Sequence, residues 1–137
     1  MTMAQQIFIN LPIKDLKKSM AFYEAIGFKN NPQFTDETAA AMALSESIIV
    51  MLLTYNKFKE FTPKEIIDGK KTAGVLNSLS FPSNAEMNDF VNKALKAGGK
   101  EYRDPQDFGF MQLRCFEDLD GHNWEAFYMD VSKFPKQ

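Results

Sequence analysis

A carboxylate on an otherwise apolar strand is the first candidate for chemistry in this sequence. Glu125 follows a polar turn centred on Gly121 and stands in a run of Trp, Ala, Phe and Tyr. This pattern predicts a hairpin that delivers the carboxylate onto a strand. Because burial raises the pKa of a carboxyl group, Glu125 could serve as a general acid or base, or as a charge that attracts an amine. The structural alternative is that Glu125 pairs with Arg103 or Arg114, or lies near a solvated rim.

Other reactive side chains are few. The chain has one cysteine, Cys115, and one histidine, His122. No base for Cys115 is identifiable in the sequence, and a free cysteine is commonly a small buried hydrophobe, so Cys115 is interpreted as part of the packing. His122 stands beside Gly121 in the hairpin turn and is interpreted as a solvated turn residue.

Length, charge and hydropathy restrict the class of protein. The 137 residues predict a single domain, and 45% hydrophobic residues supply ample core. A net charge of −2, with basic and acidic residues scattered along the chain, gives no surface for nucleic acid. No apolar run approaches the roughly 20 residues of a membrane span. Residues 1–6 lack the regions of a signal peptide, and a single cysteine suits a reducing cytoplasm, so a cytoplasmic location is expected.

Hydrophobic periodicity and turn signals predict the same order of elements twice. In the first half, a strand at residues 7–13 precedes a helix at 16–26 that Asp15 caps, and strands follow at 29–34, 39–44 and 48–55. In the second half, a strand at 76–81 precedes a helix that opens with a capping box from Ser83 to Glu86, and strands follow at 101–103, 108–116 and 123–129.

The order β-α-β-β-β in both halves predicts an α+β fold of duplicated modules, at about residues 6–56 and 73–130. Residues 57–72 are predicted to form a linker with a short helix, because Thr62 to Glu65 carries a second capping box with Pro at the first helical position. A sheet with helices on one face needs a cover for its other face, and two curved four-stranded halves can cover each other around a cavity.

The segment at residues 102–125, with its Asp107-to-Met111 and Asp118-to-Glu125 motifs, resembles the vicinal-oxygen-chelate superfamily. That superfamily includes glyoxalase I, extradiol dioxygenases, fosfomycin-modifying enzymes and bleomycin-resistance proteins. The resemblance extends in architecture over essentially the whole chain. It implies two βαβββ modules that form a curved eight-stranded mixed sheet around a cleft, with the helices outside, and it implies a symmetric homodimer.

The resemblance also implies where a metal would bind in the metal-dependent members. The four ligand positions fall on Phe8, Leu52, Leu76 and Glu125, of which only Glu125 carries a donor side chain. Catalytic zinc takes about three protein ligands and structural zinc about four, and one His and one Cys cannot supply substitutes. We therefore expect neither a metal site nor another cofactor.

Strand alternation assigns the faces around Glu125. Trp124, Ala126 and Tyr128 share the face that packs under the helices, whereas Glu125 and Phe127 share the other. With the register that the resemblance implies, the ligand-binding cleft is expected to be mostly apolar with a few polar points, as small-molecule sites usually are. Its predicted lining is Phe8, Asn10, Leu52, Leu76, Ser78, Leu113, Cys115, Glu125 and Phe127.

Three functions compete on these grounds. The first is a metal-independent protein of the glyoxalase/bleomycin-resistance type that binds a small organic ligand. The second is an enzyme, either a lactoylglutathione-lyase-like protein or another lyase or isomerase that uses Glu125 as acid or base. The third is a structural or regulatory interaction role without chemistry.

Overall fold

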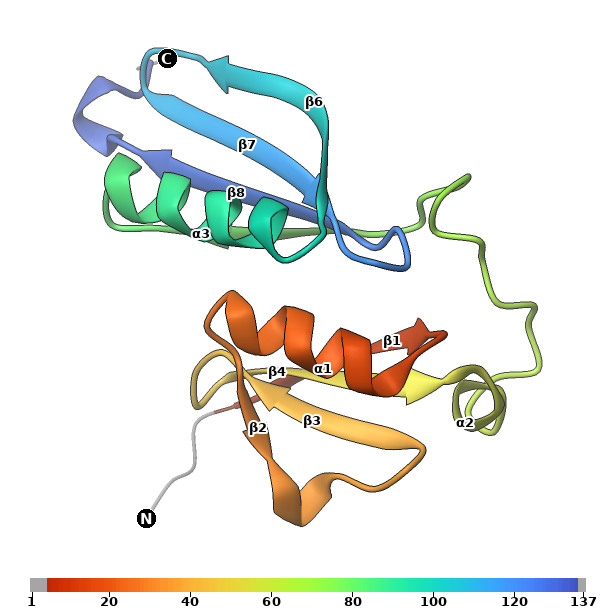
Figure 1. Cartoon of the computed structure of the whole chain (residues 1–137). Coiled ribbons are helices and arrows are strands. Elements are labelled where there is room, and N and C mark those ends of the chain that lie inside the picture. Colours follow the sequence, from red (N-terminus) through yellow and green to blue (C-terminus); the bar gives the residue numbers. More distant parts are fainter. Residues whose placement is uncertain (1–4, 136–137) are drawn as a thin grey trace. The chain divides into compact units, whose positions relative to one another are not determined.

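The computed structural model describes residues 5–135 and divides the chain into two compact units, at Asp68 and Gly69 (Figure 1). Residues 1–4, which belong to the stretch examined for a signal peptide, lie outside the described residues. Each unit contains one four-stranded sheet that mixes parallel and antiparallel pairs. The predicted α+β fold of duplicated βαβββ modules is therefore confirmed.

The first module begins with β1 (Ile7–Ile13), α1 (Leu16–Ala25) and β2 (Lys29–Asn31), and continues through a 3-10 turn (Pro32–Phe34), β3 (Ala39–Ala43), β4 (Ile48–Thr54) and α2 (Tyr55–Lys59). Its strand order is β1-β4-β3-β2, and β1 pairs parallel with β4. Asp15 caps α1 as predicted, because its carboxylate accepts the Lys18 N–H at 3.0 Å. Gly27, at a φ of 107°, ends the helix in a conformation that suits glycine.

The core of the first module lies between α1 and one face of this sheet, since α1 contacts β2, β3 and β4. Phe22 and Tyr23 of α1 pack edge to face with ring centroids 5.2 Å apart. The strands contribute side chains to this core that are at most 2% exposed, namely Ile13, Met42, Val50 and Leu52, together with Ala40.

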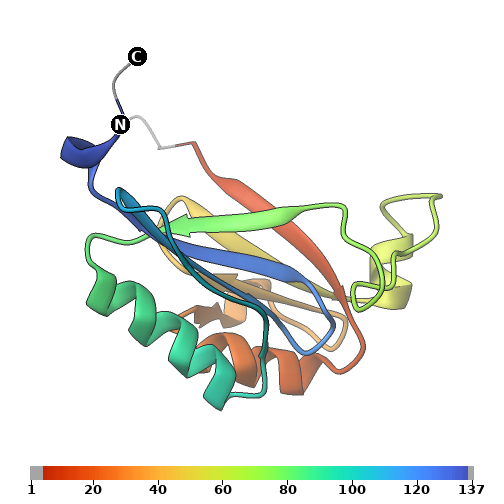
Figure 2. The same cartoon turned by 90° about the horizontal axis from the view of Figure 1, so that it is seen from above.

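The second module contains β5 (Leu76–Ser80), α3 (Asn84–Lys96), β6 (Lys100–Asp107), β7 (Met111–Glu117), β8 (Asn123–Met129) and a final 3-10 turn (Val131–Lys133). Its strand order is β5-β8-β7-β6, and β5 pairs parallel with β8. Figure 2 shows α3 along one side of this sheet, where α3 contacts β6, β7 and β8. The buried positions of α3 are Met87, Phe90, Val91 and Ala94, which lie on one face at helical spacing.

Of the predicted capping box at the start of α3, the Ser83 cap is present. The Ser83 hydroxyl accepts the Glu86 N–H at 3.1 Å and donates to the Glu86 carboxylate at 3.3 Å. The hydroxyl thus satisfies one of the backbone donors that a helix start leaves without an intrahelical partner.

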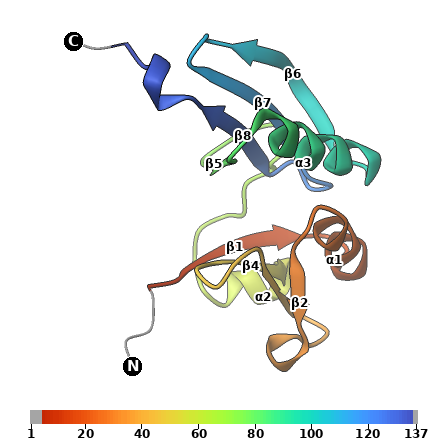
Figure 3. The same ribbon diagram turned by 90° about the vertical axis from the view of Figure 1, so that its left-hand side faces the viewer.

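The predicted linker helix at Thr62 to Gly69 is wrong. Thr62 accepts a hydrogen bond from Lys64 N–H at 3.2 Å, which makes a turn, and residues 60–75 contain no helix (Figure 3). The apolar residues available here are too few to give a helix a buried face, and Ile67 is 46% exposed. A capping sequence by itself was therefore insufficient to form a helix at these residues.

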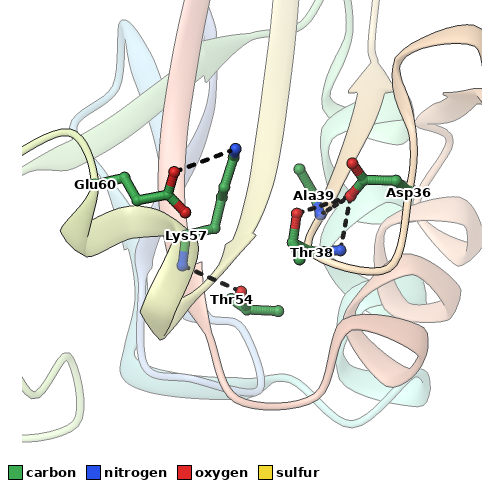
Figure 4. A network of polar contacts seen from close by, with 6 residues as sticks. All are labelled: Asp36, Thr38, Ala39, Thr54, Lys57 and Glu60. Atoms are coloured by element: carbon green, nitrogen blue, oxygen red, sulfur yellow. Dashed lines mark hydrogen bonds and ion pairs between the residues drawn. The ribbon is translucent and has the colours of Figure 1, made fainter.

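A short helix begins earlier, at the end of β4. The Thr54 hydroxyl accepts Lys57 N–H at 3.3 Å and caps α2 (Figure 4). The Thr54 N–H donates to the Thr38 carbonyl at 2.9 Å. Beside it, the Asp36 carboxylate accepts the N–H and hydroxyl of Thr38 at 2.7 and 2.8 Å, and these hydrogen bonds lower the Asp36 pKa. This network ties α2 and the start of β3 to the end of β4.

Two strand boundaries differ from the sequence prediction for identifiable reasons. β2 stops at Asn31 because Pro32 has no N–H to donate and Asn31 instead caps the 3-10 turn. β6 runs to Asp107 rather than ending at Arg103, and its pairing with β7 shifts register twice. Such shifts break the alternation on which a strand prediction relies.

Replacing Ser83 with Ala should lower the free energy of unfolding by about 1 kcal/mol, because the first turn of α3 loses its cap. Urea denaturation followed by circular dichroism measures this change. Ser80→Ala, an exposed serine on β5, is the matched control and should leave the midpoint in place. Equal effects of the two substitutions would show that the cap contributes nothing specific.

Candidate functional site

The open face of the first sheet, opposite α1, carries a groove of about 650 Å³. Leu11 and Ile13 point toward α1 and are buried, so Phe8 and Asn10 point to the open face. The pairing of β1 with β4 places Ile49 beside Phe8 and Met51 beside Asn10. All four of these side chains line the groove.

Space remains in the groove because the side chains on its floor are small. Ala41 and Ala43 of β3 lie beside Met51 and Ile49 of β4 in the sheet register. Larger side chains flank this floor: Phe8 on β1 is 52% exposed, and Phe34, after β2, is 61% exposed. The polar lining consists of three carboxamide side chains, from Gln6, Asn10 and Asn31.

The prediction that Leu52 lines the cleft is wrong. Leu52 pairs with Leu11 on the α1 side of the sheet and is fully buried in the core. Met51 occupies the corresponding place on the open face. The cause is the period of two along a strand, because an anchor misplaced by one residue moves a side chain to the opposite face.

On the second sheet, four strands contribute to one row of polar side chains on the open face. The register aligns Ser78 of β5 with Glu125 of β8, Glu125 with Cys115 of β7, and Cys115 with Arg103 of β6. The Ser78 hydroxyl donates a hydrogen bond to the Glu125 carboxylate. Leu76, Leu113 and Phe127 follow the same alternation on this face, whereas Trp124 and Ala126 are fully buried on the α3 side.

Tyr102 joins this row, and the sequence analysis missed it. The pairing of Lys100 with Glu117 would by itself place Tyr102 opposite Cys115, and the register shift that follows pairs Arg103 with Cys115 instead. A side-chain hydrogen bond with Cys115 is among the causes that raise the pKa of Tyr102. No signal in the sequence marks this shift, because it arises from the pairing with β7.

The electrostatics of the row keep its thiol and phenol protonated. Burial is the main cause that raises the pKa of Cys115, and the nearby negative charge of Glu125 adds to it. Burial likewise raises the pKa of Tyr102, with Cys115 and Glu125 contributing in the same direction. Cys115 is 1% exposed, which agrees with its interpretation as a small buried side chain rather than a nucleophile.

The alternative that Glu125 pairs with Arg114 is wrong. Arg114 points to the α3 side and forms a two-pronged ion pair with Glu101, at 2.9 and 3.0 Å. Its remaining contacts are to Asn88 and Asn92 of α3. Arg103 lies next to Cys115, yet no ion pair joins it to Glu125 within residues 5–135. The carboxylate on this face therefore has a hydroxyl partner rather than a cation.

The interpretation of His122 as a solvated turn residue is also wrong. His122 is only 8% exposed. Asp118 organises the turn by accepting the N–H groups of Asp120 and His122, both at 2.9 Å. Gly121 has a φ of 86°, and a Cβ atom there would collide with the backbone of Gly69. The close approach of the chain at Gly69 thus buries a turn that the sequence alone suggests is exposed.

The residues at the implied metal positions do not fit a metal ion. Phe8 and Leu76 offer only hydrocarbon, Leu52 is in the core and its open-face neighbour Met51 offers a thioether, which leaves one carboxylate, Glu125. Within the part of the chain that the structure describes, no group of three or more His, Cys, Asp or Glu side chains could hold a metal ion. In the same residues, every helix is too short or too polar to cross a membrane.

Comparisons with known proteins agree with this architecture. The model of the family described as the Glyoxalase/Bleomycin resistance protein/Dioxygenase superfamily matches residues 5–126. Hypothetical protein SA1046 from S. aureus is 30% identical, with a TM-score of 0.76 over 93% of this chain and 95% of that chain. None of the curated proteins matches the sequence.

Two more distant structures share the fold. A glyoxalase/bleomycin resistance protein/dioxygenase family enzyme from Burkholderia phytofirmans is 12% identical, with a TM-score of 0.77 over 92% of this chain and 99% of that chain. The fosfomycin resistance protein FosX from Listeria monocytogenes is 14% identical, with a TM-score of 0.67 over 96% of this chain and 98% of that chain.

Replacing Glu125 with Gln should lower the pKa of the Cys115 thiol, because the carboxylate charge disfavours the thiolate. NMR titration of isotope-labelled cysteine measures this directly, since the chain has a single cysteine. Stability to urea should stay unchanged or rise.

Glu37→Gln, at an exposed position of the first module, is the control and should leave the Cys115 titration as it is. An unchanged midpoint in Glu125→Gln, or unfolding of that variant, would contradict the described row.

Proposed function

Because this chain belongs to the glyoxalase/bleomycin resistance protein/dioxygenase superfamily, we propose that it binds a small organic molecule without the help of a metal ion. The observation that carries the proposal is the groove on the first module. Its volume of about 650 Å³ lies in the range of roughly 300–1,000 Å³ that is typical of ligand sites. Its lining of apolar side chains with a few carboxamides also matches the usual composition of such sites.

The donor chemistry of the chain supports independence from a metal. Lewis-acid catalysis requires an ion held by several ligands, and Glu125 by itself is one ligand. The proposed role is therefore that of a binding protein of the glyoxalase/bleomycin-resistance type, with a small organic ligand as its partner and no cofactor.

The row on the second sheet favours one alternative, a metal-free lyase or isomerase. A carboxylate that accepts a hydroxyl hydrogen bond and lies beside a protonated thiol and phenol can take a proton from a substrate carbon and return it elsewhere. In that case Glu125→Gln would abolish turnover and leave binding in the groove intact. Loss of ligand binding in Ala43→Leu without any turnover in the wild type would favour the binding protein.

Protein treated with EDTA should bind ligands in the groove, and elemental analysis should find far less than one zinc, nickel or iron per chain. The measurement is an NMR screen of small neutral and charged fragments, in which hits shift the amide signals of β3 and β4. Ala43→Leu places a branched side chain on the groove floor and should abolish these shifts.

Ala21→Leu, on the exposed side of α1, is the matched control and should bind as the wild type does. A metal-to-protein ratio near one that survives dialysis, or hits that require added zinc, would sink the proposal. Fragments that shift only amides outside the groove would do the same.

We also propose that the protein is a cytoplasmic homodimer. A two-fold contact is the default for small homo-oligomers, and one unpaired cysteine suits a reducing compartment. Light scattering at micromolar concentration should return about twice the mass of the 15.6 kDa chain. A mass that stays at the value of one chain rejects the dimer and leaves the binding proposal untouched.

A further inference from the structure

We propose that the groove on the first module selects an uncharged, planar and largely apolar ligand whose polar atoms are neutral hydrogen-bonding groups, such as a carboxamide or lactam. This inference rests on the proposed binding function and specifies the class of ligand. It is argued from three properties of the groove, which are its charge, the free polar atoms of its lining and its shape.

The first property is the absence of charge. The lining contains apolar side chains and carboxamides, without any Asp, Glu, Lys, Arg or His. An ion buried there would lose hydration and find no side chain of opposite charge in the lining itself, which is a penalty. Lys29 pairs with Ala43 and therefore points to the same face of the sheet, but it is exposed beside the groove and does not line it.

The second property is the set of hydrogen-bonding atoms that remain available. Gln6 uses its amide nitrogen on the Glu46 carbonyl at 3.0 Å, and Asn31 uses its side-chain oxygen on Gln33 N–H at 3.1 Å. The Asn10 side chain has no hydrogen-bond partner within residues 5–135. The groove therefore offers both donors and acceptors, and a carboxamide presents the complementary pair of groups.

The third property is the shape of the groove. Phe8 stands on β1 and Phe34 follows β2, and these are the two edge strands of the sheet. Three strand spacings separate those edges, which is roughly 14 Å. The floor between them consists partly of alanine side chains, so a flat ring system can lie across the two central strands while aromatic side chains flank it.

Three probes of the same size test the charge preference at neutral pH. They are naphthamide, which is neutral, naphthoate, which is an anion, and naphthylmethylammonium, which is a cation. Dissociation constants come from isothermal calorimetry on the full chain, and NMR shifts of β3 and β4 amides report the location. We expect both ions to bind at least about tenfold more weakly than naphthamide.

Asn10→Leu tests the role of the carboxamide. It should weaken naphthamide about two- to tenfold, because a hydrogen bond is lost, while binding of plain naphthalene should stay the same or strengthen. Asn56→Leu, an exposed asparagine on α2, is the matched control and should change neither affinity. Circular dichroism of both variants verifies that they are folded.

The outcomes separate the inference from the function on which it rests. If either ion binds in the groove as tightly as naphthamide or more tightly, the inference is overturned and the proposed binding function is left standing. Equal weakening of naphthamide and naphthalene in a folded Asn10→Leu variant overturns the role of the carboxamide. If no fragment or probe of any charge shifts the amides of β3 and β4, the proposed function fails and the inference fails with it.

Discussion

The structure depends on one geometric constraint, which is that the long helix of each module, α1 or α3, packs against one face of its four-stranded sheet. Successive side chains of a strand point to opposite faces, so a single strand supplies both core and open surface. On β4, Leu52 is fully buried on the α1 side while its neighbour Met51 lines the groove. On β8, Trp124 is fully buried on the α3 side while Glu125 joins the polar row. Core and candidate sites are therefore one residue apart.

The two open faces have opposite chemical character although they arise from the same module architecture. The groove in the face of the first sheet is lined by small apolar side chains and carboxamides, and none of its lining residues is charged. The face of the second sheet centres on the Glu125 carboxylate, whose charge helps to keep Cys115 and Tyr102 protonated. The repeated module architecture thus provides two equivalent surfaces whose side chains differ, as expected when one scaffold carries sites of different chemistry.

Membership in the superfamily defines the scaffold but leaves the chemistry to the side chains. The family model extends over residues 5–126, and the positions that the resemblance implies for metal ligands carry Phe8, Leu76 and, on the open face of β4, Met51. Solved structures with identities of 12% and 14% share the fold over nearly the whole chain, which shows how little of the sequence the architecture needs. A functional assignment for this chain must therefore rest on the groove and on the row around Glu125.

Local signals in the sequence determined the elements, the caps and most of the faces. Asp15 and Ser83 cap the helices that their positions predicted, and the alternation along β8 placed Glu125 on the open face. Nonlocal contacts decided the rest. Strand pairing placed Leu52 in the core and set Arg103 opposite Cys115 through a register shift, and the turn at His122 is buried where the chain at Gly69 approaches it. A helix cap, or the alternation of side chains along a strand, depends on a few consecutive residues. Strand register, bulges and burial depend instead on which distant segment of the chain packs against the strand or turn.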